Sequence, residues 1–419
     1  MRRVVVSGLG LISSIGNSKE EVLESLRTQR SGVELYEELD KPEYPVKLAG
    51  TVKGFQFQGT RPESWVLPEE YPMAREQKRS MSPNAVFGFC AMKQAIADAG
   101  LADDLVSHPR TGAMCASAGS TWLTYEFVDT MLKKGVQRVY PLGMVASIPG
   151  TLNINLVAAY GIKGASLGFA SACASSSHAF GAAFDHIRLG RQDIVFAVGA
   201  EDCKAHNILP FAGLRALTQG TDPTMQPCAF DRKRDGFVVG GGGAVLVLEE
   251  LEHAEARGAS IYAEVLGWGE ASDGFSVMAP EPEGEGLARA MVTALEAASL
   301  EPQDIDYINA HATSTIAGDV AELKAIKSVF PEGARPNVSS TKSMTGHGLS
   351  LAGALESAIC CLAMEEGMTP VSIHITDPDP ECEGVPIVTE PIQAAPKVVM
   401  SNSSGFGGTN VSLILRKWE

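Results

Sequence analysis

The sequence predicts an α/β fold that is duplicated within one chain of 419 residues. Segments with the pattern of buried strands alternate with helical segments, which indicates a mainly parallel sheet flanked by helices. Three kinds of segment also recur in the same order in the two halves of the chain, which indicates internal duplication. The composition agrees with a globular protein, because 45% of the residues are hydrophobic and 20% are charged.

The first predicted element is a buried strand within residues 1–12. Two arginines followed by apolar residues resemble a signal peptide there. However, Ser7, Gly8 and Gly10 interrupt the apolar run, and no small-residue cleavage site follows. No stretch approaches the roughly 20 continuous apolar residues that span a bilayer. We therefore expect a soluble protein.

The recurring segments are a helix followed by an apolar strand, then a turn followed by a helix, then two strands separated by glycines. In the first half these segments cover residues 91–119, 173–189 and 236–248. In the second half they cover residues 290–313, 342–364 and 398–415. We interpret Gly240 to Gly243 as a hairpin turn rather than a phosphate loop, because no Lys-Ser/Thr follows and the flanks are strand-like.

A charged, helix-like run at residues 249–258 marks the seam between the two repeats. We therefore expect an N-terminal half of residues 1–255 and a C-terminal half of residues 256–419. Residues 39–79 have a less regular pattern, with several prolines and charged residues, and are expected to form an insertion that caps the first half.

Charge and cysteine content exclude several classes of function. The chain has 34 basic and 50 acidic residues, a net charge of −16, so nucleic acid and anionic membranes are poor partners for the molecule as a whole. Its eight cysteines include no CxxC pair, so we expect no metal cluster and a reducing, cytoplasmic location.

Cys173 is the strongest candidate for catalytic chemistry. It lies between an apolar, glycine-containing run and a helix of small residues. A helix N-terminus at such a position favours the thiolate and can hold an oxyanion, although a small buried cysteine is the ordinary interpretation. His311, Lys342 and His347 lie in turns rich in Gly, Ser and Thr, and duplication would bring their loops to Cys173 across 138 to 174 residues. Together these residues indicate a thiol enzyme.

Four motifs carry a resemblance that runs over the whole chain: Ser-Ala-Cys173-Ala-Ser-Ser, Ala-His311-Ala-Thr-Ser-Thr, Ser-Thr-Lys342-Ser-Met-Thr-Gly-His and Gly405-Phe-Gly-Gly-Thr-Asn. With them the chain resembles the beta-ketoacyl acyl-carrier-protein synthases of the thiolase superfamily. The segments that begin at Asp231, Ala271 and Met278 lean toward synthase I. The resemblance implies the duplicated thiolase fold, with two pseudo-symmetric halves and mixed sheets in an α-β-α-β-α arrangement.

The implied reaction elongates an acyl chain by two carbons. The chain is bound to Cys173 and condenses with malonyl-acyl carrier protein after decarboxylation, which gives a 3-oxoacyl-acyl carrier protein. The resemblance makes Cys173 the nucleophile, His311 and His347 the stabilisers of the enolate, and Lys342 a residue that orients the site by bonding Glu356.

Further roles follow from the same resemblance. The backbone N–H groups of Cys173 and Phe406 would form the oxyanion hole. The residues expected to contact substrate are Thr313, Thr315, Gly119, Gly407 and Gly408, with Thr313 and Thr315 on the phosphopantetheine arm and Gly119 along a long acyl pocket. The arm arrives on the carrier protein, so no separate cofactor and no metal are expected.

Partners are also implied by the resemblance. An acidic acyl carrier protein would dock on basic residues that stand out from an acidic chain: Arg75, Lys78, Arg79, Lys133, Lys134 and Arg138. A homodimer would form through residues 165–171, whose small and apolar side chains suit an edge strand covered by its twin.

Three positions depart from the family pattern and leave alternatives open. Ala312 and Ile316 replace the usual Gly and Pro of the histidine motif, and Ser404 replaces a Phe. These changes are expected to alter the packing of the pocket and its loops, so chain length and pathway (fatty acid, polyene or polyketide) stay open. A thiolase is a second interpretation, but residues 402–410 lack the second cysteine that thiolases need. An inactive chain-length partner in a heterodimer is a third, although such partners usually lack the nucleophile.

Overall fold

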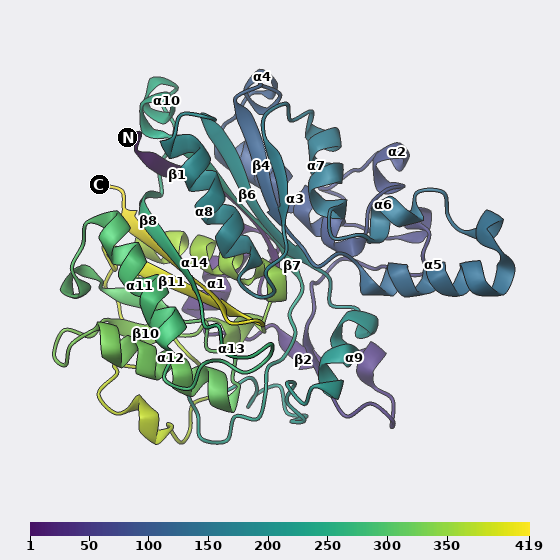
Figure 1. The fold of residues 1–419 in the computed structure, drawn as a ribbon. Coiled ribbons are helices and arrows are strands. Elements are labelled where there is room, and N and C mark those ends of the chain that lie inside the picture. Colours follow the sequence, from purple (N-terminus) through teal and green to yellow (C-terminus); the bar gives the residue numbers. More distant parts are fainter.

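The structure, a computed structural model, describes all 419 residues. Ten strands form one mixed sheet (Figure 1). Those of the first half are β1 (Val4–Ser13), β4 (Thr111–Ala116), β5 (Ser166–Phe169), β6 (Ile194–Glu201) and β7 (Gly242–Glu250). Those of the second half are β8 (Ala263–Ser272), β9 (Tyr307–Asn309), β10 (Asn337–Ser339), β11 (Val398–Gly405) and β12 (Thr409–Lys417).

The strand order repeats within the sheet. From one edge the order is β5-β4-β6-β7-β1, and from the other edge it is β10-β9-β11-β12-β8. Each half therefore uses its third, second, fourth, fifth and first strand in that order. The halves join where Val4–Val6 pairs with Ala263–Val265. The predicted duplication is confirmed by this repeat.

The sheet is mixed, so the expectation of a mainly parallel sheet is wrong. Only the three outer strands of each half pair in parallel. The strands β7 and β12 run antiparallel to both of their neighbours. Antiparallel pairing is possible because no helix packs on the sheet between the fourth and fifth strands of each half, whereas a parallel pair needs a crossover. In the second half β11 turns directly into β12, and in the first half the connection of residues 202–241 carries only a helix that packs away from the sheet.

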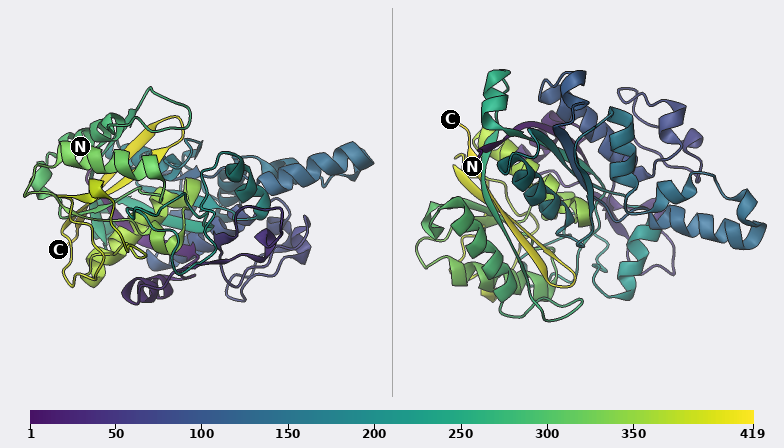
Figure 2. Two further views of the ribbon diagram at one scale, coloured as in Figure 1. Left: turned by 90° about the horizontal axis from the view of Figure 1, so that it is seen from below. Right: turned by 45° about the horizontal axis from the view of Figure 1, so that its top comes forward.

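The two halves of the sheet form two layers, and helices lie between them and on their outer faces, which gives five layers in all (Figures 1 and 2). In the middle, α8 (Ser175–Arg188) and α14 (Ala352–Glu366) contact each other and strands of both halves. On the outer face of the first half lie α3 (Pro83–Asp98) and α7 (Thr151–Tyr160), and on that of the second half lie α11 (Glu285–Ala298) and α12 (Ile316–Val329). The α-β-α-β-α arrangement is therefore present.

The two central helices approach closely because their sequences supply small residues at the contact. A side chain at Gly353 of α14 would collide with the Ser177 side chain of α8, and one at Gly181 would collide with the Trp268 ring. Residues 352–364 are all buried, and Gly367, with φ of +77°, ends the helix in the left-handed conformation. A buried helix pair thus fixes the turns that precede α8 and α14.

The remaining elements lie around this core. The helices are α1 (Lys19–Arg27), α2 (Arg75–Lys78), α4 (Asp103–Val106), α5 (Thr121–Lys134), α6 (Gly143–Ser147), α9 (Ala205–Gly213), α10 (Leu251–Ala256) and α13 (Lys342–Thr345), and β2 (Val33–Leu35) pairs with β3 (Leu48–Gly50). Within residues 39–79, Phe55 and Phe57 pack edge-on against Phe87 of α3, at 5.1 and 5.4 Å between ring centroids. Figure 2 shows α5 extending away from the body. None of the helices combines the length and the apolar character that a membrane crossing requires.

Candidate active site

Cys173 and the turn that carries His347 occupy equivalent places in the two halves. Each follows the third strand of its half and precedes a central helix: Cys173 lies between β5 and α8, and His347 lies between β10 and α14. Ala172 adopts a left-handed φ of +49°, which is rare for a residue with a side chain and forms a sharp elbow before Cys173. The duplication therefore places both turns at the ends of adjacent helices.

The structure brings the predicted trio together. The Nε2 atom of His347 lies 2.9 Å from Sγ of Cys173. Sγ and one ring nitrogen from each of His311 and His347 lie within 4.8 Å of one another. The two imidazole rings meet edge to face, with centroids 5.3 Å apart and planes at 85°.

His311 is held in place through its backbone. It follows β9, and the N–H groups of His311 and Ala312 donate to the carboxylate of Glu322 at 3.0 and 2.7 Å. Asn402 of β11 donates to the same carboxylate at 3.1 Å. Sequence reasoning missed Glu322, although a carboxylate among the apolar buried residues of α12 was a usable signal.

Lys342 forms an ion pair with Glu356, and both side chains are buried. The contact that the resemblance implied is thus present. Burial raises the pKa of Glu356 to about 7, while the charge of Lys342 acts in the opposite direction. The pair lies in the first turns of α13 and α14, beside the trio.

The protonation state of Cys173 differs from the one expected from the sequence. Burial raises the pKa of Cys173 to about 12, and the nearby Lys342 only partly offsets this effect. The resting residue is therefore a thiol rather than the expected thiolate, because burial disfavours the charged form more than Lys342 favours it. Burial first, and the charge of Lys342 second, lower the pKa of His311 and of His347 well below the ordinary value, so both imidazoles are neutral.

Glycines 240–243 support the His347 turn, and their interpretation as a hairpin turn is wrong. The N–H of His347 donates to Val238 O at 2.6 Å, and the N–H of Gly240 donates to His347 O at 2.9 Å. A side chain at Gly240 would lie 2.5 Å from the carbonyl oxygen of Thr345. Glycine is needed there because the two backbones approach directly.

The loop between β11 and β12 brings Phe406 next to the Cys173 elbow. A side chain at Gly405 would lie 2.7 Å from the Ser171 carbonyl oxygen, which also accepts a hydrogen bond from Thr409 Oγ1 at 3.3 Å. The backbone N–H groups of Cys173 and Phe406 are not used in the hydrogen bonds of the fold. In contrast, the N–H groups of Gly407 and Gly408 donate to Val277 O and Gly405 O.

A cavity of about 110 Å³ opens onto the trio. Part of its wall is aromatic: Phe406 stacks near Phe211 at 6.4 Å, and Phe237 lies 5.3 Å from the ring of His347. Thr313 and Thr315 also line it, with their hydroxyl oxygens 3.2 Å apart. Thr315 precedes α12 but its side chain makes no capping hydrogen bond, so its hydroxyl faces the cavity.

Gly119 does not line this cavity. Its φ is +81°, and a side chain would lie 2.6 Å from Ser147 O and 2.9 Å from Pro149 N. Backbone geometry alone therefore requires glycine at this position, and the acyl pocket expected beside it stays a prediction. Gly408 lines the cavity, whereas Gly407 does not.

The three departures from the family pattern have different surroundings. Ile316 is 65% exposed at the start of α12 and does not line the cavity. Ala312 is buried, and its carbonyl accepts a hydrogen bond from Ser340. Ser404 does line the cavity and donates to Asn410 Oδ1 at 2.7 Å.

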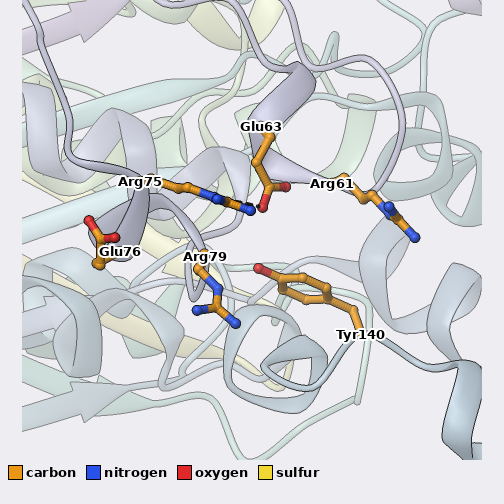
Figure 3. A pocket seen from close by; sticks show the side chains of 6 residues that line it. All are labelled: Arg61, Glu63, Arg75, Glu76, Arg79 and Tyr140. Atoms are coloured by element: carbon orange, nitrogen blue, oxygen red, sulfur yellow. Dashed lines mark ion pairs between the residues drawn. The ribbon is translucent and has the colours of Figure 1, made fainter.

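The basic residues predicted for docking fall into two groups. Arg75 and Arg79 line an open surface cavity with Arg61, Glu63, Glu76 and Tyr140 (Figure 3). Arg75 lies 3.6 Å from Glu63, and both side chains are partly exposed. Lys133 and Lys134 end the projecting helix α5, where Lys133 pairs with Asp129 at 2.9 Å. Arg138 lies two residues before Tyr140, which connects this segment to the cavity of Figure 3.

Comparison with known proteins gives the family. Residues 1–254 match the beta-ketoacyl synthase N-terminal domain, and residues 262–376 match the beta-ketoacyl synthase C-terminal domain. The chain is 42% identical to the 3-oxoacyl-acyl-carrier-protein synthase 1 of Haemophilus influenzae, with both chains covered in full. It is 40% identical to the synthase of the same name from Escherichia coli K12, over 100% of this chain and 99% of the relative.

Solved structures agree over the full length of this chain. A beta-ketoacyl synthase from Burkholderia phymatum superposes with a TM-score of 0.91 at 37% identity, with both chains covered in full. A ketosynthase of a type II polyketide synthase, solved in complex with its acyl-carrier protein and bound to the hexaketide, superposes with a TM-score of 0.85 at 28% identity, again with both chains covered in full. The chain therefore belongs to the beta-ketoacyl synthase family and is an acyltransferase that elongates acyl chains.

Proposed function

We propose that Cys173 accepts an acyl group from acyl carrier protein and that the bound chain then condenses with malonyl-acyl carrier protein as CO2 is lost. The observation that carries this proposal is the convergence of one thiol and two neutral imidazoles on one cavity. A thiol supplies the nucleophile for acyl transfer, and uncharged N–H donors suit an enolate that forms without a proton.

In the first half-reaction, Sγ of Cys173 attacks the thioester carbonyl. The Nε2–H of His347, with Nε2 2.9 Å from Sγ, donates to the sulfur and stabilises the developing thiolate, while the thiol proton passes to the departing pantetheine thiolate. The carbonyl oxygen becomes an oxyanion, and the unused N–H groups of Cys173 and Phe406 are placed to receive it. A raised thiol pKa makes this proton transfer part of the step rather than an event that precedes it.

In the second half-reaction, the malonyl thioester carbonyl accepts N–H donation from His311 and His347. The carboxylate leaves as CO2, and its electron pair forms the enolate. The enolate carbon attacks the acyl carbonyl on Cys173, which expels the thiolate, and one proton from solvent restores the thiol. Lys342, paired with Glu356, orients the site and holds both imidazoles neutral.

The substrate arm and its carrier follow from the surroundings of the site. The hydroxyls of Thr313 and Thr315 bind the phosphopantetheine arm, which the carrier protein brings, so no resident cofactor takes part. Carrier protein docks on the arginines of Figure 3 together with Lys78, Lys133, Lys134 and Arg138. The related ketosynthase solved with its acyl-carrier protein supports this mode of delivery.

Two copies of the chain pair through residues 165–171. The strand β5 is an edge strand, and Leu167 on it is 45% exposed, which leaves both hydrogen-bonding groups and apolar surface for a partner. A heterodimer with a chain-length partner would use the same edge. All eight cysteines are free, which supports a reducing, cytoplasmic location.

The test of this function is Cys173→Ala. The variant should form no acyl-enzyme and no condensation product, because no other thiol lines the cavity. It should still decarboxylate malonyl-acyl carrier protein, since that step uses the histidines. The matched control is Cys203→Ala, which removes a half-buried thiol that packs on the same hydrophobic cluster and should leave condensation intact. Normal elongation by Cys173→Ala would overturn the assignment.

A further inference from the structure

We propose that Cys173, His311 and His347 also form a binding site for a thiophilic divalent cation of the Zn²⁺ type, and that the bound cation blocks acylation of the enzyme. The proposal uses the same three side chains as the proposed function, but it does not depend on the condensation reaction. The proposal adds a metal ion as an inhibitory ligand to a site whose substrates are thioesters.

The geometry of the three ligand atoms supports the site. Sγ of Cys173 and one ring nitrogen of each histidine lie within 4.8 Å of one another, and Sγ lies 2.9 Å from Nε2 of His347. Around tetrahedral Zn²⁺, with Zn–S near 2.3 Å and Zn–N near 2.0–2.1 Å, neighbouring ligand atoms are about 3.3–3.6 Å apart. The distance between Sγ and Nε2 of His347 therefore needs to grow by roughly 0.5 Å, and the other pairs need to approach by at most about 1.5 Å to hold the ion.

The number and kind of ligands also fit. One sulfur and two imidazoles are a donor set that favours zinc and other borderline or soft cations over Mg²⁺ and Ca²⁺, which prefer oxygen. The trio lines the cavity, so the fourth tetrahedral position faces the space that substrate enters. A site with three protein ligands and one open position has the form of a reactive zinc site rather than a closed structural one.

The charge of Lys342 acts against a cation at the trio, and its ion pair with Glu356 offsets part of that effect. Lys342 is the basic side chain that acts on all three residues, and it is ion-paired with the buried Glu356. The carboxylate of Glu356, the ion-pair partner of Lys342, also acts on Cys173. Both imidazoles are neutral and so can donate a lone pair to the metal. The thiol binds as the thiolate, and its proton is released to solvent.

Occupancy by the cation and acylation exclude each other because both use Sγ of Cys173. A thioester at Sγ leaves no thiolate for the metal, and a metal-bound thiolate is a weaker nucleophile that also fills the mouth of the cavity. The cation would therefore be a reversible inhibitor, and the degree of inhibition would depend on the concentration of free zinc.

The direct test is titration of the metal-free, full-length enzyme with Co²⁺, which replaces Zn²⁺ in such sites and reports thiolate ligation by a sulfur-to-cobalt charge-transfer band. We expect one equivalent to produce the band, Zn²⁺ to displace it, and Mg²⁺ to leave it unchanged. Cys173→Ala should abolish the band. His311→Gln should weaken binding by about 100-fold or more, because even loss of a hydrogen-bond partner of a ligand costs about 10–100-fold. The control Cys203→Ala should bind normally.

A second measurement does not rely on variants that could fold poorly. Zn²⁺ should slow alkylation of Cys173 by iodoacetamide, measured by peptide mass, and prior alkylation should prevent the cobalt band. Absence of a band, a band that survives Cys173→Ala, or no protection from alkylation would overturn the proposal. Metal binding without acyl transfer would instead contradict the proposed function alone, so the two failures are distinguishable.

Discussion

The Nε2 atom of His347 lies 2.9 Å from Sγ of Cys173, although 174 residues separate them along the chain. The contact follows from the duplication, because each residue lies in the turn between the third strand of its half and a central helix. The close packing of α8 on α14, which needs glycine at position 353, fixes the distance between these turns. The pair that we propose to be catalytic is thus built from equivalent positions of two repeats.

The two histidines should contribute differently to the half-reactions. His311→Ala should lower decarboxylation of malonyl-acyl carrier protein by about 10²–10³, the usual effect of losing one stabilising donor. It should spare acylation, because His311 makes no hydrogen bond to Sγ. His347→Ala should slow both steps. Separate rates of acyl-enzyme formation and CO2 release measure this split, and undiminished decarboxylation in both variants would show that the enolate-stabilising role is wrong.

Glu201 should make stability fall as pH rises. It is buried at the end of β6, where Ser350 donates a hydrogen bond to it, and burial raises its pKa to about 8 from an ordinary 4.5. Between these values the folded state holds a proton that the unfolded state has lost, so rising pH disfavours folding. Glu201→Gln should therefore gain unfolding free energy relative to wild type from about pH 4.5 to 8 and show a constant difference above that range.

The matched control for this pH dependence is Glu249→Gln. Burial alone would raise the pKa of Glu249, but hydrogen bonds from Arg257 and His253 outweigh it and lower the pKa. Its contribution to stability should therefore be present above about pH 4.5 and be lost as pH falls, the opposite sign to Glu201. Urea unfolding across this pH range gives both slopes, and equal slopes for the two variants would argue against the buried, protonated state of Glu201.

The edge strand β5 should hold the dimer together. Leu167→Lys places a charge on the exposed part of this edge and should convert the dimer to a monomer at micromolar concentration, measured by light scattering. Leu189→Lys is the control, because Leu189 is 59% exposed but lies at the far end of α8. A wild-type monomer would contradict the interface, and a heterodimer in the native extract would favour the chain-length partner.

Charge reversal at the proposed docking surface should impair activity only when acyl-carrier protein delivers the substrate. Reversal of Lys133 and Lys134 to Glu, or of Arg75 and Arg79 to Glu, should raise the KM for acyl-carrier protein and weaken its dependence on salt. We expect about fivefold or more, since one exposed charge pair contributes up to about 1 kcal/mol. Activity with a short pantetheine thioester should stay nearly unchanged. Equal loss with both substrates would mean that these residues support the fold instead.

The sequence allowed the fold and the reacting side chains to be predicted because each signal is local. Cys173, His311 and the Lys342–His347 turn each follow a strand, and their spacing repeats between the halves. Contacts between distant backbones have no such local signal. The pattern of glycines at 240–243 predicted a hairpin turn. In the structure, the backbone of Gly240 lies against the carbonyl oxygen of Thr345, which leaves no room for a side chain.

The sequence pattern also could not predict how deeply the side chain of Cys173 is buried. The helix N-terminus beside Cys173 predicted a thiolate, whereas the surrounding fold desolvates the thiol and raises its pKa. Nothing in the sequence indicated the φ of +81° at Gly119 or the backbone at residues 147–149 that a side chain there would meet. Strand direction was also misjudged, because the strand β7 returns antiparallel beside β6.

The central claim is that Cys173 carries the acyl chain, and intact-mass analysis tests it most directly. Enzyme is incubated with acyl carrier proteins of graded chain length, and the adduct is then located by peptide mass. The account predicts one acyl group per chain on Cys173, over a range of lengths that defines the preferred substrate, and none on Cys173→Ala. No adduct at any length, or an adduct on another cysteine, would contradict it.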